Sequence, residues 1–135
     1  MYKDIYVFPA VVTTMAENDY NVSFPDFEEI ITCGETLEEA YIMAEDALKL
    51  CLFDLYQDKV IIPEATKINK IELKKNQVAI LVKVEFKKVI REYDNKAVKK
   101  TLTVPAWLNT EAEEAHLNFS HVLQEGLKRQ LNISE

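Results

Sequence analysis

Residues 36–58 read TLEEAYIMAEDALKLCLFDLYQD, and this stretch decides the fold class because its hydropathy has the period of a helix. The apolar residues recur at intervals of three and four: Leu37, Ala40, Tyr41, Ala44, Ala47, Leu48, Cys51, Leu52, Leu55 and Tyr56. Thr36 and Glu39 have the spacing of a capping box, in which two side chains satisfy free amides at a helix start. The sequence therefore predicts one long helix that ends near Asp58.

Extended segments surround this helix, because apolar and polar residues alternate on both sides of it. Residues 6–14 and 20–27 predict a hairpin across a polar turn, and residues 30–33 predict a third strand. Residues 77–86 alternate again. Their inward positions are Ile80, Val82, Val84 and Phe86. The predicted order is β-β-β-α-β, which gives an α+β domain.

A second, smaller unit is predicted after a polar and basic connector. Residues 99–104 predict a short strand, Pro105 suits the first turn of a helix, and Asn118 can cap a second helix. Such a unit cannot bury its apolar faces alone, so we expect it to dimerise. Its expected dimer core is Leu102, Val104, Trp107, Leu108, Val122, Leu123 and Leu127. The predicted division is a domain at 1–90, a connector at 91–97 and a dimerisation module at 98–135.

The formal charge of -7 is unevenly distributed along the chain. Residues 1–62 hold 3 lysines and 13 acidic residues, a net of -10, whereas residues 63–135 carry a net of +3. Residues 66–100 alone hold 11 basic and 4 acidic side chains. The acidity therefore argues against nucleic-acid binding only for the first part of the chain.

Several classes of site are not expected from the motifs. Cys33 and Cys51 form no CxxC pair, and His116 and His121 lie five residues apart with no metal-ligand partner. The chain has two glycines and therefore no Gly-rich phosphate loop. We expect no metal, no cofactor and no catalytic residue. No apolar run approaches the roughly 18 residues of a membrane helix, so a cytoplasmic protein is expected.

Four ordered motifs carry a resemblance to a known family. They are residues 8–12 (FPAVV), 20–27 (YNVSFPDF), 32–40 (TCGETLEEA) and 44–48 (AEDAL). In this order they resemble the HicB-type antitoxins of type II toxin–antitoxin systems. The resemblance implies a partial ribonuclease-H-like β-β-β-α-β domain followed by a DNA-binding module, and the tail resembles the ribbon-helix-helix type of that module.

The same resemblance implies a function and partners. The expected partner is a small, RNA-cleaving HicA-type toxin with a catalytic histidine, which the antitoxin binds and neutralises. As a homodimer, the antitoxin would also bind operator DNA and act as a transcription repressor of its own operon. Two dimers could associate into a tetramer. An acidic domain suits a basic, RNA-binding partner.

Asp26, Glu28 and Glu29 are the expected toxin-binding residues, because they follow the second predicted strand and loops at strand ends often carry recognition. The alternative interpretation is that the acidic side chains form a solvated surface that binds no partner. A divergent nuclease is a weaker alternative, since no inward-facing strand position carries a carboxylate.

The expected DNA-binding residues lie in the tail. An antiparallel ribbon from two subunits can enter the major groove, and the start of a helix can hold a backbone phosphate. The residues concerned are Lys99, Lys100, Thr101 and Thr103 on the strand, and Asn118, Phe119 and Ser120 at the second helix. Two alternatives stay open: a tail that only dimerises, and a stand-alone ribbon-helix-helix transcription regulator whose acidic domain senses a ligand or another protein.

Overall fold

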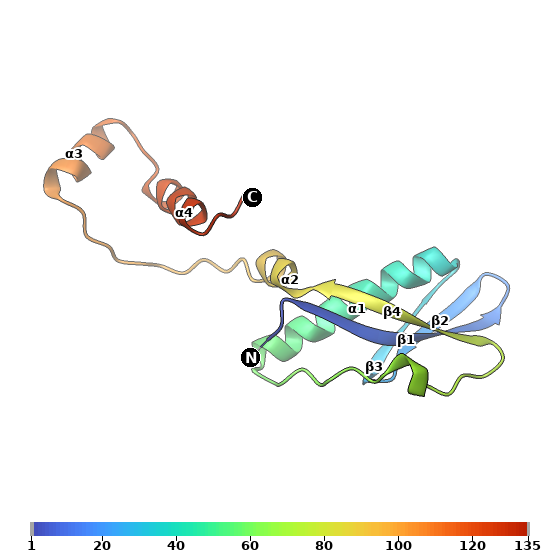
Figure 1. Ribbon diagram of the computed structural model, residues 1–135. Coiled ribbons are helices and arrows are strands. Elements are labelled where there is room, and N and C mark those ends of the chain that lie inside the picture. The colour runs from blue at the N-terminus through green and yellow to red at the C-terminus, as the bar shows by residue number, and fades with distance from the viewer. Residues whose placement is uncertain (1, 135) are drawn as a thin grey trace. The chain divides into compact units, whose positions relative to one another are not determined.

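A four-stranded antiparallel sheet forms the centre of the first part of the chain (Figure 1). Its strands are β1 (Ile5–Ala16), β2 (Asp19–Phe24), β3 (Phe27–Gly34) and β4 (Gln77–Glu85), in the spatial order β3-β2-β1-β4. The computed structural model describes residues 2–134. The predicted hairpin, third strand and fourth strand are confirmed, and so is the element order β-β-β-α-β.

Pro9 lies inside β1, although β1 has a neighbour on both sides. It is opposite Leu81 of β4, but the pairing of β1 with β2 begins only at Val11. Proline has no amide hydrogen and is tolerated where a strand lacks a hydrogen-bonding neighbour. At Pro9, β1 is therefore locally an edge strand.

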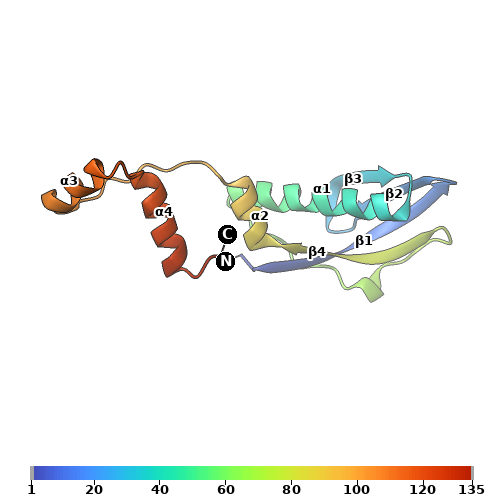
Figure 2. The same cartoon turned by 90° about the horizontal axis from the view of Figure 1, so that it is seen from above.

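Helix α1 (Leu37–Gln57) covers one face of the sheet, as Figure 2 shows. The Thr36 hydroxyl accepts a hydrogen bond from the Glu39 amide at 3.0 Å, which confirms Thr36 as the helix cap. Asp58 follows the last helical residue, as predicted. The buried face of α1 and the inner face of the sheet form one core. Its members include Phe8, Ala10, Val22, Phe24, Ala40, Ala44, Leu48, Leu52, Val82, Val84 and Phe86.

Gly34 allows β3 and α1 to meet closely. A Cβ atom at Gly34 would lie 2.5 Å from the Ala40 amide nitrogen and 2.8 Å from its Cα. Both of these atoms belong to the backbone, so they cannot move away as the end of a flexible side chain could. The absence of a side chain at Gly34 therefore sets how closely the helix approaches the end of β3.

Helix α2 (Phe86–Tyr93) follows β4 directly, so the connector predicted at 91–97 is wrong at its first three residues. Phe86 and Val89 are buried, and the Phe53 and Tyr93 rings meet edge-to-face with their centroids 5.4 Å apart. Residues 86, 89, 90 and 93 place apolar side chains on one face of a helix. Packing of that face against the core stabilises the helix.

The chain divides into two compact units, unit 1 (Met1–Lys96) and unit 2 (Ala97–Glu135). Unit 2 holds helices α3 (Ala106–Glu114) and α4 (Phe119–Gln130). The strand predicted at 99–104 does not form in this single chain, where residues 94–105 have neither helix nor strand. A strand needs a partner for its backbone hydrogen bonds, and a ribbon between subunits takes that partner from a second chain.

Candidate functional site

The three acidic residues predicted to bind a toxin lie around the start of β3 and have different surroundings. The Asp26 carboxylate accepts hydrogen bonds from the Thr66 hydroxyl at 2.6 Å and from the Thr66 amide at 3.1 Å. Glu28 is exposed and accepts no hydrogen bond from residues 2–134. Glu29 faces helix α1. The three carboxylates are therefore close in sequence, but they do not form one cluster in the structure.

Glu29 contacts a thiol on α1. The Cys51 Sγ donates a hydrogen bond to the Glu29 Oε1 at 3.5 Å. The pKa of the Cys51 thiol is raised to about 12, first by burial and then by the hydrogen bond and negative charge of Glu29 and the charge of Asp54. The thiol therefore stays protonated and unreactive at neutral pH.

Glu29 and Cys51 are part of a groove of about 360 Å³ between β3 and α1, which we call the β3–α1 groove. Its lining residues are Glu29, Ile30, Ile31, Ala47, Leu50, Cys51, Asp54, Leu55 and Asp58. The floor is apolar, and the charged lining residues are all acidic. Sequence reasoning missed this groove because β3 and α1 come together only in the folded chain.

The predicted DNA-binding residues fall in two places in unit 2. Lys99, Lys100, Thr101 and Thr103 are exposed on the extended segment before α3. At α4, the Asn118 side chain accepts a hydrogen bond from the His121 amide at 3.1 Å, which confirms the predicted helix cap. Among residues 2–134, the amides of Phe119 and Ser120 find no acceptor. Free amides of this kind are suited to holding a phosphate.

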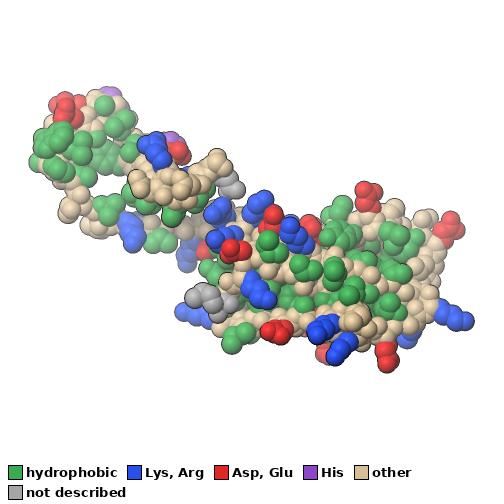
Figure 3. Space-filling view, in the orientation of Figure 1, with side chains coloured by type: hydrophobic (Ala, Val, Ile, Leu, Met, Phe, Trp, Pro, Cys, Tyr) green, Lys and Arg blue, Asp and Glu red, His purple; other side chains and the backbone are tan. Residues whose placement is uncertain are grey.

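The predicted dimer core is exposed in the single chain. Figure 3 shows hydrophobic side chains at the surface of α3 and α4. All seven predicted residues are exposed, with Trp107 at 64%. In fact, no described residue of unit 2 is buried. A unit with this much exposed apolar surface lacks a core of its own.

A protein-family model covers most of the chain. It is described as the HicB_like antitoxin of bacterial toxin-antitoxin system, and it matches residues 8–126. This chain belongs to that family. The HicB-type resemblance of its motifs is thereby confirmed for a stretch that spans both units.

Individual HicB antitoxins are similar to parts of this chain. Antitoxin HicB of Escherichia coli (strain K12) is 43% identical over 63 residues, which is 46% of this chain and 45% of the relative. Antitoxin HicB 1 of Photorhabdus laumondii is 41% identical over 56 residues, or 42% of this chain and 36% of the relative. The chain thus spans less than half the length of the curated relatives it matches.

Two solved structures are similar to this HicB-like chain over almost its whole length. A chain of a toxin–antitoxin complex from Streptococcus pneumoniae has 26% identity and a TM-score of 0.61, with 93% of this chain and 99% of that chain covered. The antitoxin HicB of Burkholderia pseudomallei has 19% identity and a TM-score of 0.55, with 96% and 98% covered. At this low identity, the second similarity shows a shared fold and nothing more.

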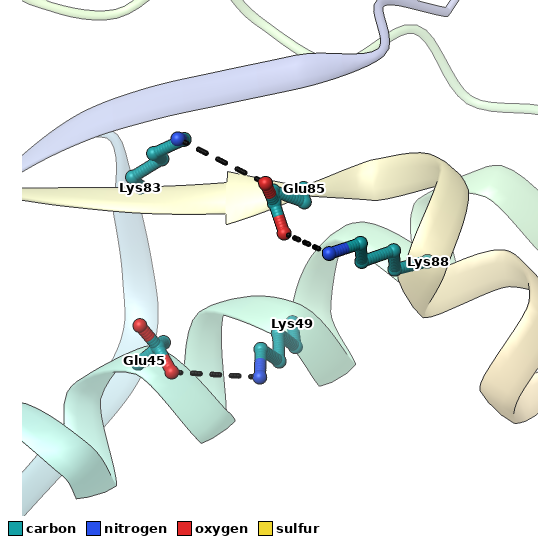
Figure 4. Close-up of polar contacts among 5 residues, drawn as sticks. All are labelled: Glu45, Lys49, Lys83, Glu85 and Lys88. Atoms are coloured by element: carbon teal, nitrogen blue, oxygen red, sulfur yellow. Dashed lines mark ion pairs between the residues drawn. The ribbon is translucent and has the colours of Figure 1, made fainter.

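Basic side chains of this HicB-like chain gather where β4 meets α2, and several are paired with carboxylates (Figure 4). The Nζ atoms of Lys88 and Lys83 lie 3.0 Å and 3.9 Å from the carboxylate oxygens of Glu85. On the nearby helix α1, the Lys49 Nζ lies 3.4 Å from the Glu45 Oε1. The hydrogen bond and charge of Lys88 lower the pKa of the Glu85 carboxyl. The two Glu85 pairs are exposed, and exposed ion pairs contribute little to stability.

Neither a metal-binding cluster nor a membrane-spanning helix occurs in the part of the HicB-like chain that the structure describes. Among residues 2–134, no three His, Cys, Asp or Glu side chains gather in a way that could hold a metal ion. No described helix is long and apolar enough to cross a membrane.

Proposed function

We propose that this HicB-family chain neutralises a small RNA-cleaving toxin of the HicA type through unit 1 and binds operator DNA as a dimer through unit 2. The observation that supports it best is the contrast between the two units. Unit 1 presents carboxylates around β3 and α1, including Asp26, Glu28 and Glu29, whereas unit 2 exposes apolar helix faces beside a basic segment. An acidic surface suits a basic, RNA-binding toxin, both for steering and for competition with phosphate.

Dimerisation through unit 2 is supported by its exposed apolar residues. Leu102 and Val104 would pair with the same segment of a second chain, and this contact would supply the missing strand partner. The helices α3 and α4 would bury Trp107, Val122 and their apolar neighbours against the second copy. The resulting ribbon-helix-helix module would present Lys99, Thr101 and Thr103 to the major groove.

Operator binding through this module would make the protein a repressor of its own operon. The amides at the start of α4 would hold a DNA phosphate behind the Asn118 cap. In this proposal neither activity needs a metal or cofactor, and the chain has no catalytic role.

Co-expression tests the proposal directly. A HicA-type toxin, sought as a short reading frame beside this gene, should copurify with the full chain and with residues 1–96, whereas residues 97–135 should be needed for a gel shift of the promoter DNA. DNA binding without copurification of the neighbouring protein would favour a stand-alone regulator. Failure of the full chain to shift its promoter at low salt would contradict the repressor role.

A further inference from the structure

The outer edge of β3 is open. β3 is the last strand on its side of the sheet, and within residues 2–134 no backbone hydrogen bond reaches its outer edge. The strand is eight residues long, and Ile31 near its middle is 77% exposed. An open edge with an exposed apolar residue is a template for pairing with another chain.

The β3–α1 groove runs beside this open edge and is apolar at its floor. Ile31 of β3 and Leu50 of α1 both line it, and Leu50 is 55% exposed. A strand added at β3 would point alternate side chains toward the groove, because successive side chains of a strand face opposite sides. The edge and the groove together therefore form one potential binding surface.

The groove is also negatively charged. Glu29, Asp54 and Asp58 are its charged lining residues, and no lysine or arginine lines it. The raised pKa of the Cys51 thiol arises partly from Glu29 and Asp54, which agrees with a negative potential inside the groove. A bound segment with positive side chains would neutralise this charge.

We propose that the β3–α1 groove binds an extended, positively charged segment of the toxin, which adds as a strand to the outer edge of β3. This inference rests on the proposed function and names the surface that carries it. Backbone hydrogen bonds to β3 would supply affinity, while apolar contacts with Ile31 and Leu50 and charge pairing with Asp54 and Asp58 would supply specificity.

A second copy of this chain is a poor occupant for the same surface. In antiparallel self-pairing of β3, each strand would bring Glu28 and Glu29 to the interface. The surrounding residues 1–62 carry a net charge of -10, so two copies would repel one another. A basic segment avoids this repulsion.

Two substitutions on α1 provide a matched test. Leu50→Lys places a positive charge in the groove, while Ile42→Lys makes the same kind of change on the same helix outside the groove lining. Leu50 and Ile42 are equally exposed, at 55% each. The probe is a HicA-type toxin, sought as a short reading frame beside this gene and titrated calorimetrically into each full-length variant. We expect Leu50→Lys to raise Kd on the order of 10-fold or more and Ile42→Lys to change it less than about 2-fold.

A charge pair gives a second matched comparison. Asp54→Asn with Asp58→Asn removes two charges from the groove, and Glu38→Gln with Asp46→Asn removes two charges from the same helix outside the lining. Both double variants have the same net charge, so general steering of the partner changes equally. We expect the double variant at positions 54 and 58 to weaken the salt dependence of Kd more than the double variant at positions 38 and 46.

Hydrogen exchange tests the added strand. Binding of the same partner should slow exchange in the peptide 27–34, which contains β3, and leave the opposite edge strand at 77–85 unchanged. If the wild-type chain does not bind the neighbouring protein, the proposed function itself fails. If it binds, but Leu50→Lys has wild-type Kd or β3 exchanges at its free rate, the groove proposal is wrong and the toxin binds another surface. Self-association through β3, seen as slower exchange of the peptide 27–34 in the free full-length chain at higher protein concentration, would also overturn it.

Discussion

The Thr66 hydroxyl donates a hydrogen bond of 2.6 Å to the Asp26 carboxylate, which joins two residues that are 40 positions apart. The Thr66 amide donates to the same carboxylate at 3.1 Å. This contact ties the long connection between α1 and β4 to the turn between β2 and β3. Asp26 therefore has a structural role whether or not it also meets a partner.

Removal of the Asp26–Thr66 contact should destabilise the fold. We expect Asp26→Ala to lower the free energy of unfolding by about 1–2 kcal/mol, since a partly exposed carboxylate with several hydrogen bonds lies in the lower part of the range for charged groups. Urea unfolding of Asp26→Ala, Thr66→Ala and the double variant gives the coupling energy. Glu28→Ala is the control, because the Glu28 side chain accepts no hydrogen bond from any described residue. Additive losses at positions 26 and 66 would contradict the contact.

Gly34→Ala should be more harmful than its small volume suggests. The new methyl group would lie 2.5 Å from the Ala40 amide nitrogen, so β3 or the start of α1 must shift. Overpacking of this kind costs about 1–3 kcal/mol, and we expect a loss of at least about 2 kcal/mol by urea unfolding. An unchanged unfolding midpoint would show that α1 can move away from β3 without loss.

Much of unit 1 could be predicted from local patterns. Thr36 and the period of residues 37–56 predict α1 with its correct start, and the alternation in residues 77–86 identifies the buried side chains of β4. Helix α2 was missed even though Phe86, Val89, Ile90 and Tyr93 have helical spacing. Its charged residues suggested a connector, whereas packing on the core decides its structure.

The candidate site could not be predicted in the same way. Cys51 and Glu29 are 22 residues apart, and their contact depends on how α1 crosses β3. Local hydropathy identifies both elements but not the groove between them. The strand expected at 99–104 shows a different limit, because its hydrogen-bond partner belongs to another molecule in the proposed dimer.

The Cys51 thiol should react slowly with alkylating reagents. With a pKa of about 12 in place of the ordinary 9.0, only about one thiol in a thousand is ionised at pH 9. Because Glu29 contributes to this shift, Glu29→Gln should lower the pKa and speed alkylation, with burial keeping it above 9.0. The pH dependence of iodoacetamide labelling in a Cys33→Ser background measures the effect. Half-maximal reactivity near pH 9 in the parent would refute the assigned environment.

Gly126→Ala probes what surrounds α4. Within residues 2–134, an added Cβ at Gly126 would have no heavy atom within 4 Å beyond its chain neighbours and the backbone of its own helix. Alanine should therefore stabilise the helix by about 1 kcal/mol. Thermal unfolding followed by circular dichroism at several protein concentrations checks this result. Destabilisation that grows with concentration would show instead that a second chain lies against Gly126.

Lys99 and Thr103 should affect DNA binding differently. If Lys99 contacts phosphate, Lys99→Ala lowers the slope of log K against log salt by about one, whereas Thr103→Ala relaxes sequence preference. Fluorescence anisotropy with promoter DNA and a scrambled duplex at several salt concentrations separates the two effects. Lys67→Ala, in unit 1, is the control and should leave both quantities unchanged. Equal behaviour of all three variants would argue against a DNA-reading strand.

Pro9 has a consequence for the chain segment that lies beside β1. Beyond the end of β2, residues 61–65 and residues 5–8 of β1 line one pocket, and Pro9 itself is fully buried. Any other residue at position 9 would place a buried amide where β1 has no strand neighbour, and a buried amide without an acceptor costs free energy. Proline has no such donor. The connection after α1 can therefore lie against this part of β1 without adding a fifth strand to the sheet.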